Sequence, residues 1–383
     1  MQRIYMDYAS TTPVAPEVAE AMLPWINTYF GNPSSQYEEG RKARKAVEAA
    51  RLQVAQAIGA DPKEIYFTSC GSESDNWALK GVAFRNREKG NHIIVSSIEH
   101  HAVLNTCRFL EREGFEVTYL PVDAEGVVDL DALEKAIKDT TILVSIMMAN
   151  NEIGTLQPME AIADMVKPRG IILHTDAVQA FGSLPVNVKK MNVDMLSLSG
   201  HKVYGPKGIG ALYLRKGVPI ANLIDGGNQE NKRRAGTENV ANIVGLGQAA
   251  ALTASQLDED TTRLIRLRDQ LIEGILSHIP QSRLTGHPSS RLPGNASFCF
   301  DFLDAQAILT NLDMDGIAAS SGSACTAGAI ETSHVLEAIG LPESISRGAV
   351  RFSLGRYTTE EEVVQVIEKM TSITERLRRI AGN

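Results

Sequence analysis

Between residues 64 and 214, short apolar runs rich in β-branched residues alternate with longer segments of helical periodicity, and this alternation limits the possible folds more than any other feature. Seven runs predict β-strands, at 64–69, 92–97, 115–120, 141–149, 171–177, 193–199 and 208–214. Three segments between them predict helices, at 73–89, 102–114 and 129–138. Strands that alternate with helices favour an α/β fold in which helices wrap a mostly parallel sheet.

The C-terminal part has a different pattern. From about Asn239 one long helical stretch runs to a break near Pro280. Apolar segments at 295–300, 316–323 and 349–355 then predict a smaller sheet, closed by a terminal helix from Thr359. With 383 residues, 43% of them hydrophobic, the chain is long enough for two domains. We expect a large domain over 15–257 and a smaller α+β domain formed by 1–14 and 258–383.

Charge and cysteine usage argue against several classes of protein. The 38 basic and 46 acidic side chains give a net charge of −8 without a dense Lys/Arg run, so we expect no nucleic-acid partner. No run of 18 apolar residues predicts a membrane span, and Arg3 and Asp7 stand where a signal peptide needs apolar residues. We therefore expect a cytoplasmic protein. The four cysteines form no CxxC pair and no zinc-like cluster, so we expect neither structural disulfides nor a metal site.

Polar loops follow the predicted strands, at the ends where open α/β sheets bind ligands. Four loops carry more polar groups than a structural turn needs: TSCGSESDN (68–76), SIEHHAVLN (97–105), MANNEIGT (148–155) and HTDAVQAFG (174–182). A fifth loop, within SLSGHKVYGPKGIGALYL (197–214), places Lys202 among serines, glycines and a proline. The five loops together predict a ligand site at this edge of the sheet.

Each of these residues also has a purely structural explanation. Ser72 with the acids after it is typical of a helix N-cap, and His100 alone is typical of a surface histidine. Asp176 is compatible with an N-cap, although a buried acid needs a cationic partner. Lys202 is compatible with a solvated turn. Only the combination of these residues favours a function.

One ligand would use all of them, because it has a phosphate, a protonated ring nitrogen, a flat aromatic face and an aldehyde. Backbone N–H groups of Gly71 and Ser72 at a helix N-terminus suit the phosphate. Asp176 suits the ring nitrogen, His100 suits stacking on the ring, and Lys202 suits imine formation. The ligand that these groups predict is pyridoxal phosphate.

The chain resembles the cysteine desulfurases of the NifS/IscS type, within the fold-type I, class V aminotransferase-like enzymes. The resemblance covers essentially the whole chain, through YMDYASTTP, FGNPSS, FTSCGSESDN, EHHAVL, NNEIGT, HTDAVQ, LSGHKVYGPKGIGALY, AGTEN, SSGSACTAG and RFSLGRYTTEEE. By this resemblance Lys202 is the Schiff-base lysine, and His100 stacks on the ring and acts as general acid or base. Asp176 holds the pyridinium, Gln179 donates to the phenolic oxygen, and Asn151 lies beside cofactor and substrate.

The resemblance also implies the phosphate site, the substrate site and the oligomer. The phosphate would be held by Gly71, Ser72, Ser199 and His201. Thr237 would reach the phosphate from the other subunit, which implies a homodimer. Arg351 would clamp the carboxylate of L-cysteine.

The stretch ASSGSACTAGAIETSHVLEA contains the cysteine that the resemblance makes catalytic, Cys325. A cysteine among small residues is also typical of a simple turn. In this family the same motif is a mobile loop whose cysteine accepts sulfur as a persulfide. Cys70 lies at the predicted phosphate turn, Cys107 in an amphipathic helix and Cys299 in an apolar strand, so we expect only Cys325 to carry sulfur.

The implied activity is conversion of L-cysteine to L-alanine, with sulfur delivered to an acceptor protein of iron–sulfur cluster assembly or tRNA thiolation. Selenocysteine lyase and another class V enzyme, such as an aminotransferase, are the alternatives. A nucleotide-phosphate loop lacks the required GxxxxGK[ST] spacing, and a non-catalytic protein on this fold would not need Lys202, Asp176 and Cys325 together.

The sequence departs from the family pattern at three positions: Tyr37, where relatives usually have histidine, and Asn228 and Asn231, which replace a glycine and an arginine. The sequence also ends with ERLRRIAGN, without the longer tail that housekeeping members use to dock a scaffold. We therefore expect differences at the pocket mouth, the dimer contact or the choice of acceptor.

Overall fold

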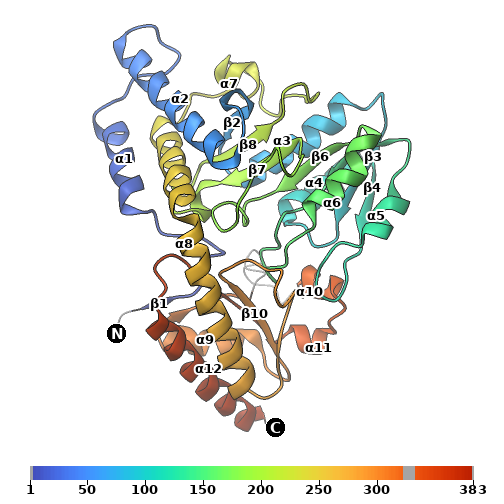
Figure 1. Ribbon diagram of the computed structural model, residues 1–383, viewed down its shortest axis with the longest axis vertical. Coiled ribbons are helices and arrows are strands. Elements are labelled where there is room, and N and C mark those ends of the chain that lie inside the picture. Colours follow the sequence, from blue (N-terminus) through green and yellow to red (C-terminus); the bar gives the residue numbers. More distant parts are fainter. Residues whose placement is uncertain (1–2, 322–332, 382–383) are drawn as a thin grey trace.

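The computed structural model describes residues 3–321 and 333–381. Its largest part is a seven-stranded sheet with the order β2-β8-β7-β6-β5-β3-β4 (Figure 1). The strands are β2 (Ile65–Thr68), β3 (His92–Ser96), β4 (Glu116–Leu120), β5 (Thr141–Ser145), β6 (Ile172–Asp176), β7 (Met195–Ser199) and β8 (Gly210–Leu214). Strands β7, β6, β5, β3 and β4 are parallel, whereas β8 runs antiparallel to β2 and β7. The predicted α/β fold with a mostly parallel sheet is confirmed.

Helices cover both faces of this sheet, and they bury nearly all residues of its strands apart from the edge strand β4. Side chains alternate between the faces: on β7, Met195 packs in one apolar core and Leu196 in the other. The Met195 face is covered by α3 (Gly71–Arg85) and α4 (His101–Arg112). The opposite core includes residues of α1 (Pro16–Asn27), α2 (Glu38–Ile58), α5 (Leu130–Ala136), α6 (Met159–Val166) and α8 (Val240–His278).

A second, antiparallel sheet has the order β12-β10-β9, with β9 (Ser282–Leu284), β10 (Asn295–Phe300) and β12 (Ala349–Ser353). Beside it, β1 (Ile4–Tyr5) pairs in parallel with β11 (Ile317–Ala318). The helices of this part are α9 (Ala305–Met314), α10 (His334–Ala338), α11 (Glu343–Ser346) and α12 (Glu360–Ala381). The prediction that 316–323 joins the smaller sheet is confirmed only in part for its described residues: β11 pairs with β1, whereas Ser320 forms an isolated antiparallel bridge with Arg351 of β12. The third strand, β9, has the sequence SRL and no apolar run that predicts a strand.

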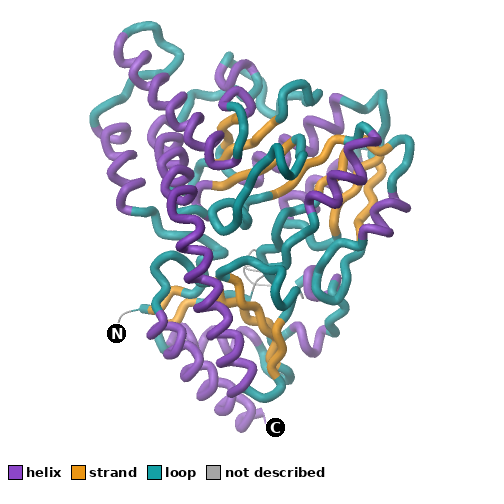
Figure 2. Tube along the Cα trace, viewed as in Figure 1, coloured by secondary structure: helices purple, strands orange, loops and turns teal. Residues whose placement is uncertain are grey.

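The helix expected from Asn239 is α8, and Asn239 is its N-cap. Its first half buries Ile243 and Leu246 in the core of the large sheet, and its second half buries Leu267 and Leu271 in the core of the small sheet. Figure 2 shows α8 as one continuous helix beside both sheets. The predicted domain boundary at 257/258 falls inside this helix, and the division into two domains stays a prediction.

Residues 3–321 and 333–381 lack two kinds of feature. None of their helices combines the length and the apolar character needed to cross a membrane. Within the same residues, no three His, Cys, Asp or Glu side chains are grouped closely enough to hold a metal ion.

Candidate active site

A cavity of about 380 Å³ lies where β6 and β7 end, at the carboxyl edge of the large sheet. Most of the predicted site residues line it: Gly71, Ser72, His100, Asn151, Asp176, Gln179, Ser199, His201, Lys202 and Arg351. Its wall also includes Ala9 and Ser10 from the N-terminal segment and Asp75 from α3. The fold thus brings together groups from five loops and from the small sheet.

Lys202 follows β7 directly, at the end of the short helix η3 (Gly200–Lys202). Its Nζ donates hydrogen bonds to the carbonyl oxygens of Ala9 and Ser10, the latter at 2.7 Å. Two carbonyl acceptors stabilise the ammonium form of a lysine. Lys207, the other lysine of the loop, is exposed and is not among the cavity-lining residues.

Asp176 ends β6 with its side chain 6% exposed. Its Oδ1 accepts a hydrogen bond of 2.8 Å from the N–H of Val178. Burial raises the pKa of Asp176 to about 6, and the Val178 hydrogen bond and the Lys202 charge act in the opposite direction. The carboxylate is therefore mostly ionised at neutral pH and is suited to hold a protonated ring nitrogen.

The first turn of α3 and the end of β7 form a small anion cradle. Gly71 and Ser72 begin α3, where backbone N–H groups have no helical acceptor. The buried Ser199 Oγ has no hydrogen-bond partner among the described residues. A Cβ at residue 71 would lie 2.7 Å from Val178 Cγ2, so only glycine allows the backbone of α3 to lie this close to Val178 beside the cavity. Open N–H groups and an unpaired hydroxyl fit the phosphate of pyridoxal phosphate.

Two neutral imidazoles line the cavity. Burial, and then the charges of His101, Lys202 and His334, lower the pKa of His100 to about 4. His100 Nδ1 accepts the N–H of Ala102 at 3.1 Å as the N-cap of α4, which assigns its proton to Nε2. Burial and the charges of Lys202 and Lys207 likewise lower the pKa of His201 to about 4. A neutral ring at His100 suits stacking on an aromatic cofactor.

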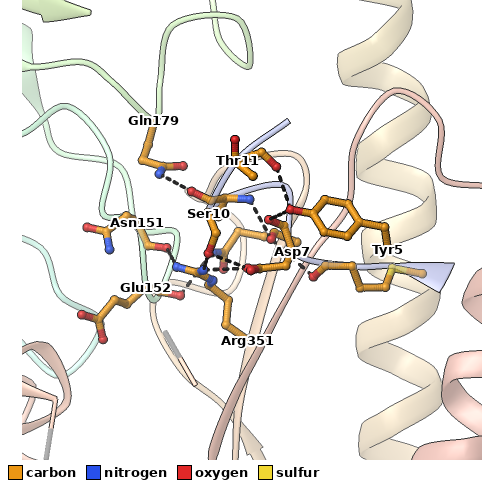
Figure 3. Close-up of polar contacts among 12 residues, drawn as sticks. Tyr5, Asp7, Ser10, Thr11, Asn151, Glu152, Gln179 and Arg351 are labelled. Atoms are coloured by element: carbon orange, nitrogen blue, oxygen red, sulfur yellow. Dashed lines mark hydrogen bonds and ion pairs between the residues drawn. The ribbon is translucent and has the colours of Figure 1, made fainter. Parts of the chain in front are cut away.

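Arg351 reaches the cavity from β12 of the small sheet (Figure 3). Its Nη1 donates to the carbonyl of Asn151 at 2.8 Å, and its Nη2 donates to Asp7 Oδ1 at 2.9 Å and to Ser10 Oγ at 3.0 Å. The Arg351 Nε, although buried, has no partner among the described residues. A fixed guanidinium with an unused donor suits a substrate carboxylate.

Sequence reasoning missed the residues that fix Arg351. Ser10 Oγ donates to Asp7 Oδ1 at 2.9 Å, and the Tyr5 hydroxyl donates to the carbonyls of Asp7 and Thr11 at 3.0 and 2.9 Å (Figure 3). All of these residues lie in the motif YMDYASTTP, which the sequence shows. The motif alone does not reveal that they contact Arg351 on β12.

The remaining predicted residues differ in their placement. Gln179 lines the cavity, and its Nε2 donates to the Ala9 carbonyl at 2.9 Å. Thr237 is exposed in the loop between α7 (Gln229–Lys232) and α8, and is not among the lining residues. Cys325 lies outside the described residues.

The other three cysteines have different surroundings. Burial raises the pKa of the Cys107 thiol, and it raises that of Cys299 to about 12, so both stay protonated at neutral pH. Cys70 is partly exposed and lines the cavity at the N-cap of α3.

The three departures from the family pattern are not among the residues that line this cavity. Tyr37 is 58% exposed at the N-cap of α2. Asn228, with φ −87°, has an ordinary backbone conformation, so a glycine is not required there. Asn231, with φ 55°, is left-handed, a conformation that asparagine tolerates better than most residues.

The family model described as aminotransferase class-V matches residues 4–366. A cysteine desulfurase IscS of Methanosarcina thermophila is 55% identical over 378 residues, which cover 99% of this chain and 93% of that protein. A solved NifS-like protein has a TM-score of 0.93 at 40% identity, covering 98% of this chain and all of that one. A solved structure of SspA in complex with cysteine has a TM-score of 0.82 at 42% identity, with coverages of 93% and 100%. On fold, cavity and similarity alike, the chain belongs to the class-V aminotransferase family and, within it, to the cysteine desulfurases of the NifS/IscS type.

Proposed function

We propose that this protein is a pyridoxal-phosphate-dependent cysteine desulfurase that converts L-cysteine to L-alanine and passes the sulfur to an acceptor. The observation that carries the proposal is one cavity in which Lys202 and Asp176 lie together with the buried Arg351. A lysine and an acid suit the cofactor, and the arginine suits an amino-acid carboxylate.

The cofactor would be held at its two ends. Gly71, Ser72, Ser199 and His201 would bind the phosphate, and Asp176 would keep a proton on the ring nitrogen. When bound, pyridoxal phosphate supplies an aldehyde that bonds to an amine and a ring that accepts electrons from the substrate Cα. Stacking of His100 and donation from Gln179 would fix the orientation of the ring.

The chain's own groups handle the substrate and its protons. Arg351, fixed by Asp7, would bind the carboxylate of L-cysteine and orient its Cα. Lys202 would take the Cα proton at Nζ. The carbonyls of Ala9 and Ser10 would then stabilise the resulting ammonium, as they do in the structure.

Sulfur transfer would use Cys325. Its thiolate would attack the substrate sulfur, so that a sulfur–sulfur bond forms and the carbon–sulfur bond breaks. The electron pair of the broken bond stays with carbon, which is protonated to the methyl group of alanine, and Cys325 is left as a persulfide. The described residues on both sides of the Cys325 segment support this role. Ser320 pairs with Arg351, and Ser333 Oγ donates to Glu152 at 2.6 Å, next to Asn151.

The oligomer and the acceptor follow from the same proposal. Thr237 lies outside the cavity of its own subunit, which supports its predicted role at the phosphate of a partner in a homodimer. The acceptor would be a protein of iron–sulfur cluster assembly or tRNA thiolation, and the cytoplasmic location stays a prediction from the sequence.

The proposal is tested by incubating the protein, reconstituted with pyridoxal phosphate, with L-cysteine and a thiol reductant. We expect alanine and sulfide in equal amounts, and neither product from Lys202→Ala. Transfer of the amino group to a 2-oxo acid without sulfide would identify an aminotransferase and contradict the proposal.

A further inference from the structure

Asp75 is a second carboxyl group in the wall of the cavity, and it has no role in the proposed mechanism. It lies in α3 and is 1% exposed, and like Asp176 it lines the cavity. Its Oδ1 has no hydrogen-bond partner among the described residues. A buried, ionised carboxylate without a nearby cation lowers the stability of the fold, unless protonation neutralises it or hydrogen bonds compensate its charge.

A row of polar side chains connects Asp75 to the centre of the sheet. Ser145 Oγ on β5 lies 2.8 Å from His174 Nδ1, and His174 Nε2 on β6 lies 3.0 Å from Ser197 Oγ on β7. The Ser197 hydroxyl also lies beside the Asp75 carboxyl, where its hydrogen bonding acts to lower the pKa of Asp75 against the stronger effect of burial. Ser197 is the register partner of Asp176, so this row runs directly beside the predicted ring-nitrogen ligand.

The charges in this region cannot all be present together. Asp75, Asp176 and Glu99 are buried, and the negative charges of the last two raise the pKa of Asp75 further after burial has raised it. His174 lies 3.7 Å from Asp75 Oδ1, but burial lowers the pKa of this imidazole to about 3, so it does not supply a positive charge. The titratable groups that act on Asp75 among the described residues include Cys70, Glu99, His174 and Asp176, with Lys202 acting on Asp176.

We propose that Asp75 carries a proton and acts as a neutral positioning residue that holds the Ser197–His174–Ser145 row beside Asp176. With this proton in place, the nearby Asp176 is ionised and would hold the ring nitrogen of the cofactor without a second negative charge from Asp75. The inference rests on the proposed function for its effect on the cofactor, but the protonation of Asp75 itself does not depend on the cofactor.

The proton is tested directly by infrared difference spectroscopy of the cofactor-free protein at pH 7, wild type minus Asp75→Asn. We expect a carboxylic C=O band that shifts when aspartate is labelled with ¹³C at Cγ, which separates it from any band of Glu99. Asp194→Asn is the matched control. Asp194 is equally buried but paired with Lys167 and Arg215, so its loss should remove a carboxylate band instead. Loss of a carboxylate band in Asp75→Asn would overturn the proposal.

The positioning role is tested by cofactor affinity. Asparagine reproduces the shape and neutrality of a protonated aspartate, so Asp75→Asn should bind pyridoxal phosphate within about threefold of wild type. Asp75→Ala leaves the Ser197 hydroxyl without its acceptor, so we expect binding weaker by about tenfold or more. Equal losses in both variants would mean that the charge is required, and no loss in Asp75→Ala would mean that the side chain has no role.

The two tests also separate this inference from the proposed function. If the wild-type protein binds no pyridoxal phosphate, the proposed function fails, while the infrared measurement still decides whether Asp75 is protonated. If Asp75→Ala does not fold, Asp75→Asn and the infrared spectra still provide the contradicting outcomes.

Discussion

At the scale of single residues, burial decides which groups around the cavity are charged. It lowers the pKa of His100 and His201, and it raises that of Asp176 to a value close to 6. The cations among the described residues that line the cavity are Lys202, which donates to two carbonyl oxygens, and Arg351, which pairs with Asp7. The site therefore presents separate positions for an anion, a ring nitrogen and a carboxylate.

Lys202→Ala should abolish covalent attachment of the cofactor, because no other lysine is among the residues that line the cavity. The measurement is peptide mapping after borohydride reduction of the reconstituted protein. Lys207→Ala, in the same loop but exposed, is the control and should be labelled on Lys202 as in wild type. A label on Lys207 in the wild-type protein would contradict the assignment.

Asp176→Asn should remove a pH dependence from cofactor binding. The wild-type carboxylate is ionised above a pKa of about 6, so its affinity for a protonated ring should fall as the pH drops below 6, by up to about tenfold per pH unit. Asparagine cannot titrate. The cofactor phosphate titrates in the same pH range and affects both proteins alike. The informative quantity is therefore the ratio of the cofactor dissociation constants of Asp176→Asn and wild type at each pH. A ratio that stays constant between pH 5 and 7 would exclude Asp176 as the ring-nitrogen partner.

Asp7→Asn should weaken substrate binding more than turnover, because Asp7 orients Arg351 without lining the cavity. We expect KM for L-cysteine to rise by about tenfold, with kcat changed by less than threefold. Asp313→Asn breaks an exposed ion pair with Arg3 near the same end of the chain and should change neither constant. A fall in kcat with unchanged KM would assign Asp7 a different role.

At the scale of elements, a left-handed turn in α7 depends on a buried ion pair. Glu230, Asn231 and Lys232 have φ of 45°, 55° and 67°, which is unfavourable for residues with a Cβ. Glu230 accepts two hydrogen bonds from Arg51, at 2.7 and 2.9 Å, and one from the N–H of Phe67 at 2.9 Å. These contacts hold the turn that precedes Thr237 against α2 and β2.

Glu230→Gln should therefore lower the free energy of unfolding by about 3 kcal/mol, because it leaves the buried Arg51 without its main counter-charge. Glu48→Gln removes another carboxylate beside the same arginine, but Glu48 is 58% exposed, so we expect a loss under about 0.5 kcal/mol. Urea denaturation measures both values. Similar losses in the two variants would show that the buried pair does not hold this turn.

The elements also show how far the sequence predicts this structure. Each strand of the large sheet lies within a predicted apolar run, and Lys202 and Asp176 are recognisable because they stand at the ends of such runs. The short β9 lacks this signal. The contacts of Arg351 with Asp7 and of Arg51 with Glu230 join residues far apart in the chain, and periodicity carries no information about such pairs. The charge states of His100 and Asp176 depend on burial, which only the folded chain determines.

At the scale of the whole molecule, the proposed function predicts a homodimer in which each subunit completes the site of the other. Thr237 is exposed and does not line the cavity of its own subunit. Its predicted role in the partner's site can therefore be tested with a heterodimer of one Lys202→Ala subunit and one Thr237→Ala subunit. The second subunit retains Lys202 and receives Thr237 from its partner, so its cofactor affinity should match wild type. Homodimeric Thr237→Ala should bind several-fold more weakly. Weak binding in the heterodimer as well would place Thr237 in its own subunit's site.

In the proposed function, this site moves sulfur from L-cysteine to one thiol of the chain. The most direct test of this transfer is mass spectrometry of the reconstituted protein, quenched after a single turnover with L-cysteine. We expect one added sulfur atom on the peptide that contains Cys325 and one alanine per sulfur, with no added sulfur on Cys70, Cys107 or Cys299. Added sulfur on Cys70 instead, or full sulfide release by Cys325→Ser, would contradict the account.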